Sequence, residues 1–157
     1  MANNRVPVFP KTPSLQSKAG AVIGPSANTS LDGTGSNIYE VFQAKDTSGT
    51  GTDSDSKVFF LRAKAVGSPA ATVLRVFIYN GSSGTFTPGT SNTASNTFLV
   101  TELSLPAITA SSTAASPDFT IPVNLELPTG NRILVTFGTS TGASGTGYVV
   151  SAFGGTY

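Results

Sequence analysis

The stretch Ala71–Tyr79 reads ATVLRVFIY and is followed by Asn80 and Gly81. It is dense in β-branched and aromatic residues, which favour the extended backbone of a strand. The Asn-Gly pair that closes it is typical of a hairpin turn. Arg75 is the charged residue of the run, and we expect it to face outward or to lie at a sheet edge. The stretch therefore predicts a β-strand in an all-β domain.

Further strands are predicted on both sides of this run, each bounded by Gly, Pro or Asn turn signals. Pro122 inside one of them indicates an edge strand or a bulge. About eight strands at these spacings are typical of an antiparallel sandwich of two sheets, and we expect one such domain over residues 19–157. The predicted strands are 19–24, 37–44, 57–66, 71–79, 97–105, 118–127, 131–137 and 147–153.

Residues 1–18 differ in composition from the rest of the chain. They hold three prolines and three basic residues, and the first acidic residue is Asp32. Prolines at this density favour an extended or polyproline-like backbone. We interpret the segment as an extended arm that docks on a partner, and a frayed terminus is the alternative. The side chains available for docking are Arg5, Val6, Val8, Phe9, Lys11, Leu15 and Lys18.

The composition excludes several reactive chemistries. The chain has no His, Cys or Trp, so it cannot build a Ser-His-Asp or Cys-His centre, a thiolate zinc site or a disulfide. Its eight acidic residues allow many carboxylate pairs, so no pair is specific for glycoside hydrolysis. We expect a protein that is not an enzyme and that needs no cofactor.

Charge and hydropathy restrict the partners. The net charge is +1, from nine basic and eight acidic residues, which is not the basic excess of a nucleic-acid-binding protein. No run of apolar residues reaches the length of a membrane span. The first residues do not resemble a signal peptide. We expect synthesis in a cytoplasm and neither a membrane nor a nucleic acid as partner.

Long polar loops are the remaining candidate sites, and we expect them to be exposed. In the loop 46–56, Asp46, Asp53 and Asp55 could offer oxygen ligands to Ca²⁺, but their spacing matches no calcium loop. We favour solvated carboxylates and predict no metal site. In the loop 81–96, Phe86 could anchor a partner or fold back over a sheet edge, and both alternatives stay open.

Three segments together resemble small virion proteins of tailed bacteriophages. The first is Ala71–Gly81 (ATVLRVFIYNG), and the second is Thr101–Pro106 (TELSLP). The third is Leu125–Thr136 (LELPTGNRILVT), with the chain ending in Phe153–Tyr157 (FGGTY). The resemblance covers roughly residues 37–157 and involves strand ends rather than a catalytic motif.

The resemblance implies a structural protein of the particle with a jelly-roll-like sandwich. Its implied role is head decoration, or cement: binding to the major capsid protein on the outer capsid surface, often as a homotrimer, and stabilising the shell. The arm and Phe86 would then contact the capsid or a neighbouring subunit. The alternative is a carbohydrate- or receptor-binding module of a tail or fibre, with its site in the loops 46–56 and 81–96.

Overall fold

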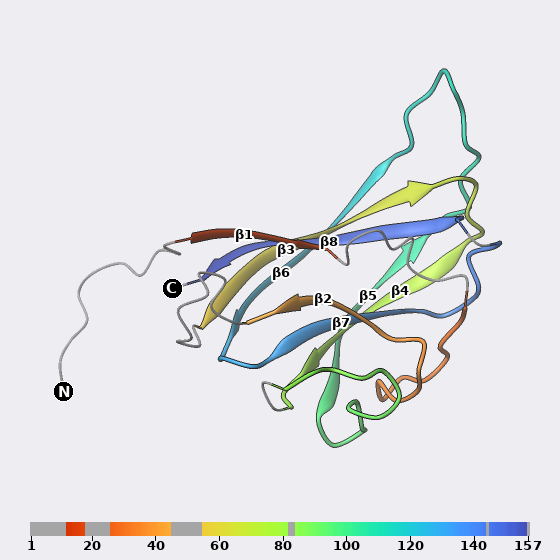
Figure 1. Cartoon of the computed structure of the whole chain (residues 1–157). Coiled ribbons are helices and arrows are strands. Elements are labelled where there is room, and N and C mark those ends of the chain that lie inside the picture. Colours follow the sequence, from red (N-terminus) through yellow and green to blue (C-terminus); the bar gives the residue numbers. More distant parts are fainter. Residues whose placement is uncertain (1–11, 18–25, 45–54, 82–83, 144, 157) are drawn as a thin grey trace, which may run out of the picture.

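Every regular element in the described part of the chain is a β-strand (Figure 1). The computed structural model describes residues 12–17 (backbone only), 26–44, 55–81, 84–143 and 145–156. The all-β prediction is confirmed. The eight strands are β1 (Thr12–Ser17), β2 (Tyr39–Gln43), β3 (Ser56–Val66), β4 (Thr72–Tyr79), β5 (Thr97–Leu105), β6 (Asp118–Leu127), β7 (Arg132–Phe137) and β8 (Gly147–Thr156).

The strands form two four-stranded antiparallel sheets that pack face to face. Sheet A has the order β1-β8-β3-β6, and sheet B has the order β2-β7-β4-β5. The first strand pairs with the last, the second with the seventh, the third with the sixth and the fourth with the fifth. This is the pairing of one long hairpin rolled up into two sheets, which is a jelly roll. The predicted sandwich and its jelly-roll type are confirmed.

The core lies between the sheets, where alternate residues of each strand point inward. Tyr148 of β8 is fully buried in this core. Its ring stacks with Phe137, with centroids 6.3 Å apart, and meets Phe119 edge-on at 6.2 Å. Its hydroxyl donates a hydrogen bond to the carbonyl of Pro106, so the polar end of the ring is satisfied. The core is therefore both filled and hydrogen-bonded around this ring.

Loops cover the outer face of sheet B and build a second, smaller core. Ile38, Phe77, Tyr79 and Leu134 are buried there, and Phe86 packs against them. The side-chain amide of Asn92, which is 3% exposed, donates to the carbonyls of residues 33 and 35 at 2.6 and 2.9 Å. The expectation that the loop 81–96 is exposed is therefore wrong for Asn92, because its polar groups have partners inside the protein.

Arg132 at the start of β7 is a buried charge, 2% exposed. Its Nε lies 2.7 Å from a carboxylate oxygen of Glu40 on β2. It also donates to the carbonyls of Gly130 and Gly84, and it lies over the Tyr79 ring, 5.7 Å from the centroid. This one side chain therefore joins β2, β4, β7 and the loop that covers sheet B.

Part of the predicted arm belongs to sheet A. Thr12–Ser17 pairs with β8 as the edge strand β1, where a proline such as Pro13 is tolerated because an edge strand has a free side. Residues 1–11 and 18–25 lie outside the described residues, as does the predicted strand 19–24. The boundary between arm and domain at residue 18 stays a prediction.

Candidate functional site

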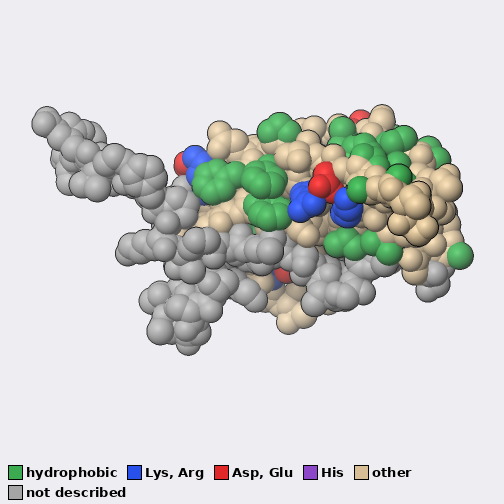
Figure 2. Space-filling view, turned by 90° about the horizontal axis from the view of Figure 1, so that it is seen from above, with side chains coloured by type: hydrophobic (Ala, Val, Ile, Leu, Met, Phe, Trp, Pro, Cys, Tyr) green, Lys and Arg blue, Asp and Glu red, His purple; other side chains and the backbone are tan. Residues whose placement is uncertain are grey.

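Apolar side chains gather on the outer face of sheet A, between two groups of charges (Figure 2). Phe60 of β3 and Phe153 of β8 are register partners, and their rings stack with centroids 4.6 Å apart and planes 15° from parallel. Pro122 of β6 is the register partner of Phe60 on the other side. Phe59 is 42% exposed. We call Phe59, Phe60, Pro122 and Phe153 the aromatic patch.

The backbone is irregular at the level of this patch. Between Val58 and Phe60, β3 shifts register against both of its neighbours. Relative to β8, Phe59 is an extra, bulged residue of β3. Relative to β6, the extra residue lies on β6, where Val123 and Asn124 face Phe59 alone. On β6, Asn124 has a φ of 44°, in the left-handed region that costs non-glycine residues free energy. Bulges are over-represented where they re-aim a side chain. Here the bulge brings Phe59 to the same surface as Phe60.

Gly154 permits the close approach of β8 to β3 beside the stack. A Cβ atom at this position would lie 2.2 Å from the carbonyl oxygen of Lys57. Only glycine fits so close to a neighbouring backbone. The position of the Phe153 ring beside Phe60 thus depends on a glycine at the next residue.

Ion pairs border the patch at both ends. On one side Lys57 lies 3.4 Å from Glu126, whose side chain is 72% exposed. On the other side Asp118 is paired with Arg62 at 2.5 Å and with Lys64 at 2.9 Å. Hydrogen bonds from Lys64 and then Arg62 lower the pKa of the Asp118 carboxyl. The patch therefore has one base paired with a more exposed acid at one end and two bases around one acid at the other.

The lowered pKa of Asp118 predicts a loss of stability in acid. Because the folded-state pKa is below the ordinary value of 3.8, the ion pair contributes stability above that pH and loses it as the pH falls through the folded-state pKa. We expect Asp118→Asn to lower the urea midpoint at pH 7. The difference from wild type should shrink below pH 4, and urea titrations at both pH values measure it. A difference that is equal at both pH values would contradict this cause.

The geometry of the patch suits an apolar contact. The Phe60 and Phe153 rings each cover one face of the other, which leaves less open ring face for a sugar to stack on. The patch carries no nucleophile or titratable group. Its surface can bury against a partner, and the exposed charges at its ends can fix the orientation of that partner.

A second exposed apolar run lies on β5, the edge strand of sheet B. Phe98, Leu99 and Val100 are 48%, 40% and 38% exposed. Edge strands of this kind are open to pairing with other chains unless something covers them. This run also holds a bulge, because Val100 is an extra residue of β5 between the register pairs Val76–Thr101 and Phe77–Leu99, and the Arg75–Glu102 ion pair lies beside it. We treat the aromatic patch as the better-built surface because two of its rings stack on each other across neighbouring strands.

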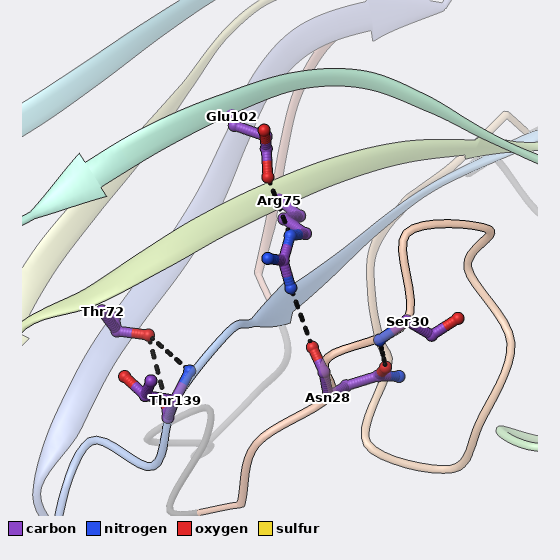
Figure 3. A network of polar contacts seen from close by, with 6 residues as sticks. All are labelled: Asn28, Ser30, Thr72, Arg75, Glu102 and Thr139. Atoms are coloured by element: carbon purple, nitrogen blue, oxygen red, sulfur yellow. Dashed lines mark hydrogen bonds and ion pairs between the residues drawn. The ribbon is translucent and has the colours of Figure 1, made fainter.

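A groove of 560 Å³ lies beside β4 and β5, lined by Ala71, Thr72, Val73, Arg75, Ser104, Leu105, Pro106, Gly138 and Thr139. Figure 3 shows the polar contacts at its edge. Arg75 lies 2.8 Å from Glu102 and donates to the carbonyl of Asn28 at 3.0 Å. The Thr72 hydroxyl and the Thr139 backbone are also joined. These bonds tie the loop before β2 to β4, which gives Arg75 a structural role.

Two of the predicted contact residues lie in the described part of the chain. Phe86 is half-buried and meets Tyr79 edge-on, with centroids 5.3 Å apart, so its ring is folded back over sheet B. Leu15 lies on β1, at the register position opposite Phe153 of the patch. The other predicted contact residues, which lie outside the described residues, are Arg5, Val6, Val8, Phe9, Lys11 and Lys18.

Asp55 is the described member of the predicted carboxylate loop, since Asp46 and Asp53 lie outside the described residues. Its carboxylate accepts a hydrogen bond from the backbone N–H of Thr129 at 2.9 Å. Among the described residues no group of three or more acidic side chains could hold a metal ion. The structure thus gives Asp55 a role in joining two loops.

The sequence did not single out the patch. Strict alternation along 57–66 places Phe59 with Leu61 on one face and Val58 with Phe60 on the other. The bulge reverses this, and Val58 faces the core with Leu61. Pro122 was the available signal, because a proline within a strand indicates an edge or a bulge. Both are present, since β6 is an edge strand and shifts register beside Pro122.

Within the described ranges there is no helix long and apolar enough to span a membrane. Comparison of the chain with protein-family models, with curated proteins and with solved structures finds no match. The site is therefore interpreted from its own residues and geometry.

Proposed function

We propose that this protein is a structural component of a bacteriophage particle, a decoration protein that binds the outer surface of the capsid and stabilises the shell. The observation that carries the proposal is the aromatic patch: an apolar surface with a ring stack on a jelly-roll face, bordered by ion pairs and without reactive groups. Such a surface is suited to adhesion rather than to catalysis.

The fold and the sequence resemblance add support of a weaker kind. Jelly rolls occur in viral capsid and lectin domains, but a fold alone does not imply a function. Between a capsid domain and a lectin domain, the resemblance of Ala71–Gly81 and the later segments to virion proteins favours the capsid domain. Many copies on a symmetric shell would add up weak contacts, so each contact surface can be small.

Copy number per particle tests the proposal directly. We would measure the ratio of this protein to the major capsid protein in purified particles by quantitative mass spectrometry. Hundreds of copies in a fixed ratio would support decoration, as expected for a protein bound at symmetric shell sites. A few dozen copies or fewer would place it in the tail or fibre. Absence from the particle would overturn the proposal.

Deletion of the arm tests how the protein attaches. We expect a chain lacking residues 1–11 to fold but to bind undecorated capsids at least about tenfold more weakly, because an extended docking segment is lost. The deletion stops before β1, since Thr12–Ser17 pairs with β8. Co-sedimentation with capsids measures binding, and circular dichroism checks the fold. Undiminished binding would remove the arm from attachment.

A further inference from the structure

We propose that the aromatic patch of one copy is the docking site for the N-terminal arm of a second copy, so that copies are linked by exchanged arms. The inference concerns two copies of this chain and stands without a particle; on a capsid, the patch with the arm seated on it would be part of the face that meets the shell. It joins a surface that no described residue covers with apolar side chains to a segment whose side chains are themselves apolar and basic.

The arm has the chemistry that the patch needs. Val6, Val8 and Phe9 are apolar and lie within four successive positions. Burying such side chains against exposed rings is favourable by about 25 cal/mol per Å² of apolar surface. Prolines in the segment restrict its unbound conformations, so less entropy is lost when it is ordered on a partner.

The charges match in position as well as in sign. Lys11 follows Phe9 by two residues, so both side chains lie on one side of an extended chain, about 7 Å apart. On sheet A, the Lys57–Glu126 pair follows the patch by a similar step along the strands. The exposed carboxylate of Glu126 also lines a hollow of 180 Å³ with Asp55. A basic arm residue would thus lie near Glu126 and Asp55, beside the Lys57 that already pairs with Glu126, when Phe9 meets the patch.

The course of β1 favours a second copy over the same chain. Thr12 lies opposite Thr156, three residues beyond Phe153 along β8, so the arm joins sheet A at a point past the level of the patch. A return to its own patch needs a sharp reversal between Pro10 and Pro13, and each proline biases the residue before it to extended backbone. Eleven extended residues span about 36 Å, enough to reach a neighbour.

The symmetry of this contact is that of a ring. An arm that binds a different surface on the next copy makes a heterologous contact, which closes into a ring when the rotation permits. This suits the homotrimer that the sequence resemblance implies.

Cross-linking between single-cysteine variants of the full chain tests the proposal, because the natural chain has no cysteine. We would mix Val8→Cys with Phe59→Cys, add a short bis-maleimide and identify the products by mass. The matched control replaces Phe59→Cys by Phe98→Cys, at a site of similar exposure on sheet B. We expect the mixed two-chain product to exceed the control by about tenfold or more, as for a bound segment of high effective concentration.

Two outcomes of this experiment overturn the proposal. One is an equal yield from Phe59→Cys and Phe98→Cys, which would mean that the arm does not seek the patch. The other is found in a chain that carries both Val8→Cys and Phe59→Cys: if it cross-links only within itself, also when mixed with other copies, the arm covers its own patch.

Mass in solution gives an independent measurement. We expect wild type to be a multimer by size exclusion with light scattering, and Phe60→Ser or the pair Val8→Asp with Phe9→Asp to shift it to monomer. Combining the changes should add nothing, because they remove the same contact. Phe98→Ser should stay multimeric. A wild-type monomer at tens of micromolar, or a multimer that the Phe60 change leaves intact, would overturn the proposal.

Discussion

Arg132→Ala is expected to lower the free energy of unfolding by about 3–5 kcal/mol, the range found when one member of a buried charge pair is removed. The substitution removes the ion pair with Glu40 and leaves the carbonyl of Gly130 without its donor. It also leaves a void in the small core under Tyr79. Because this guanidinium joins two strands to a covering loop, we expect the loss to spread over the outer side of sheet B.

Urea unfolding followed by circular dichroism measures this loss. The matched control is Arg62→Ala, because Arg62 is also paired with a carboxylate but its side chain is 44% exposed. An exposed pair contributes at most about 1 kcal/mol. Glu40→Ala should also cost clearly more than Arg62→Ala, since it leaves the buried Arg132 charge without its carboxylate. Equal losses for Arg132→Ala and Arg62→Ala would contradict the role given to Arg132.

Tyr148 allows ring packing and hydrogen bonding to be separated at one position. Tyr148→Ala is expected to cost about 3–5 kcal/mol, as for other fully buried aromatic rings. Tyr148→Phe keeps the ring between Phe137 and Phe119 and loses only the bond to the Pro106 carbonyl. That change should cost about 1–3 kcal/mol, because it leaves a carbonyl without its donor.

Thermal and urea unfolding of both variants test this expectation. If Tyr148→Phe costs as much as Tyr148→Ala, the hydroxyl rather than the ring holds the strand in place. If neither variant loses stability, the ring does not lie at the centre of the core. In either case the packing described for β8 would be wrong.

Most of the strands could be predicted from alternation, because a half-buried strand must place apolar residues at every second position. The segments 97–105 and 118–127 coincide with β5 and β6. The prediction from local sequence is incomplete where pairing with a distant strand decides whether a segment becomes a strand. Residues 12–17 have too few apolar residues in alternation to indicate a strand, and they form one because β8 offers a free edge.

The candidate site was harder to predict, because it depends on departures from a regular strand. One inserted residue, Phe59, reverses the side on which its neighbours lie, and local sequence does not fix where a bulge falls. The burial of Arg132 could not be predicted from the local sequence either. Its partner Glu40 lies on a strand far away in sequence, and a lone arginine in a strand is usually exposed.

The pairing of the first strand with the last has a consequence for synthesis on the ribosome. The last strand, β8, lies inside sheet A, and β1 has β8 as its partner there. Until residues 147–156 have been translated, β1 has no neighbour in sheet A and one edge of β3 is exposed to solvent. Contacts between such distant segments also form slowly. A prematurely terminated chain would therefore lack the strand that holds β1 in sheet A and covers the edge of β3.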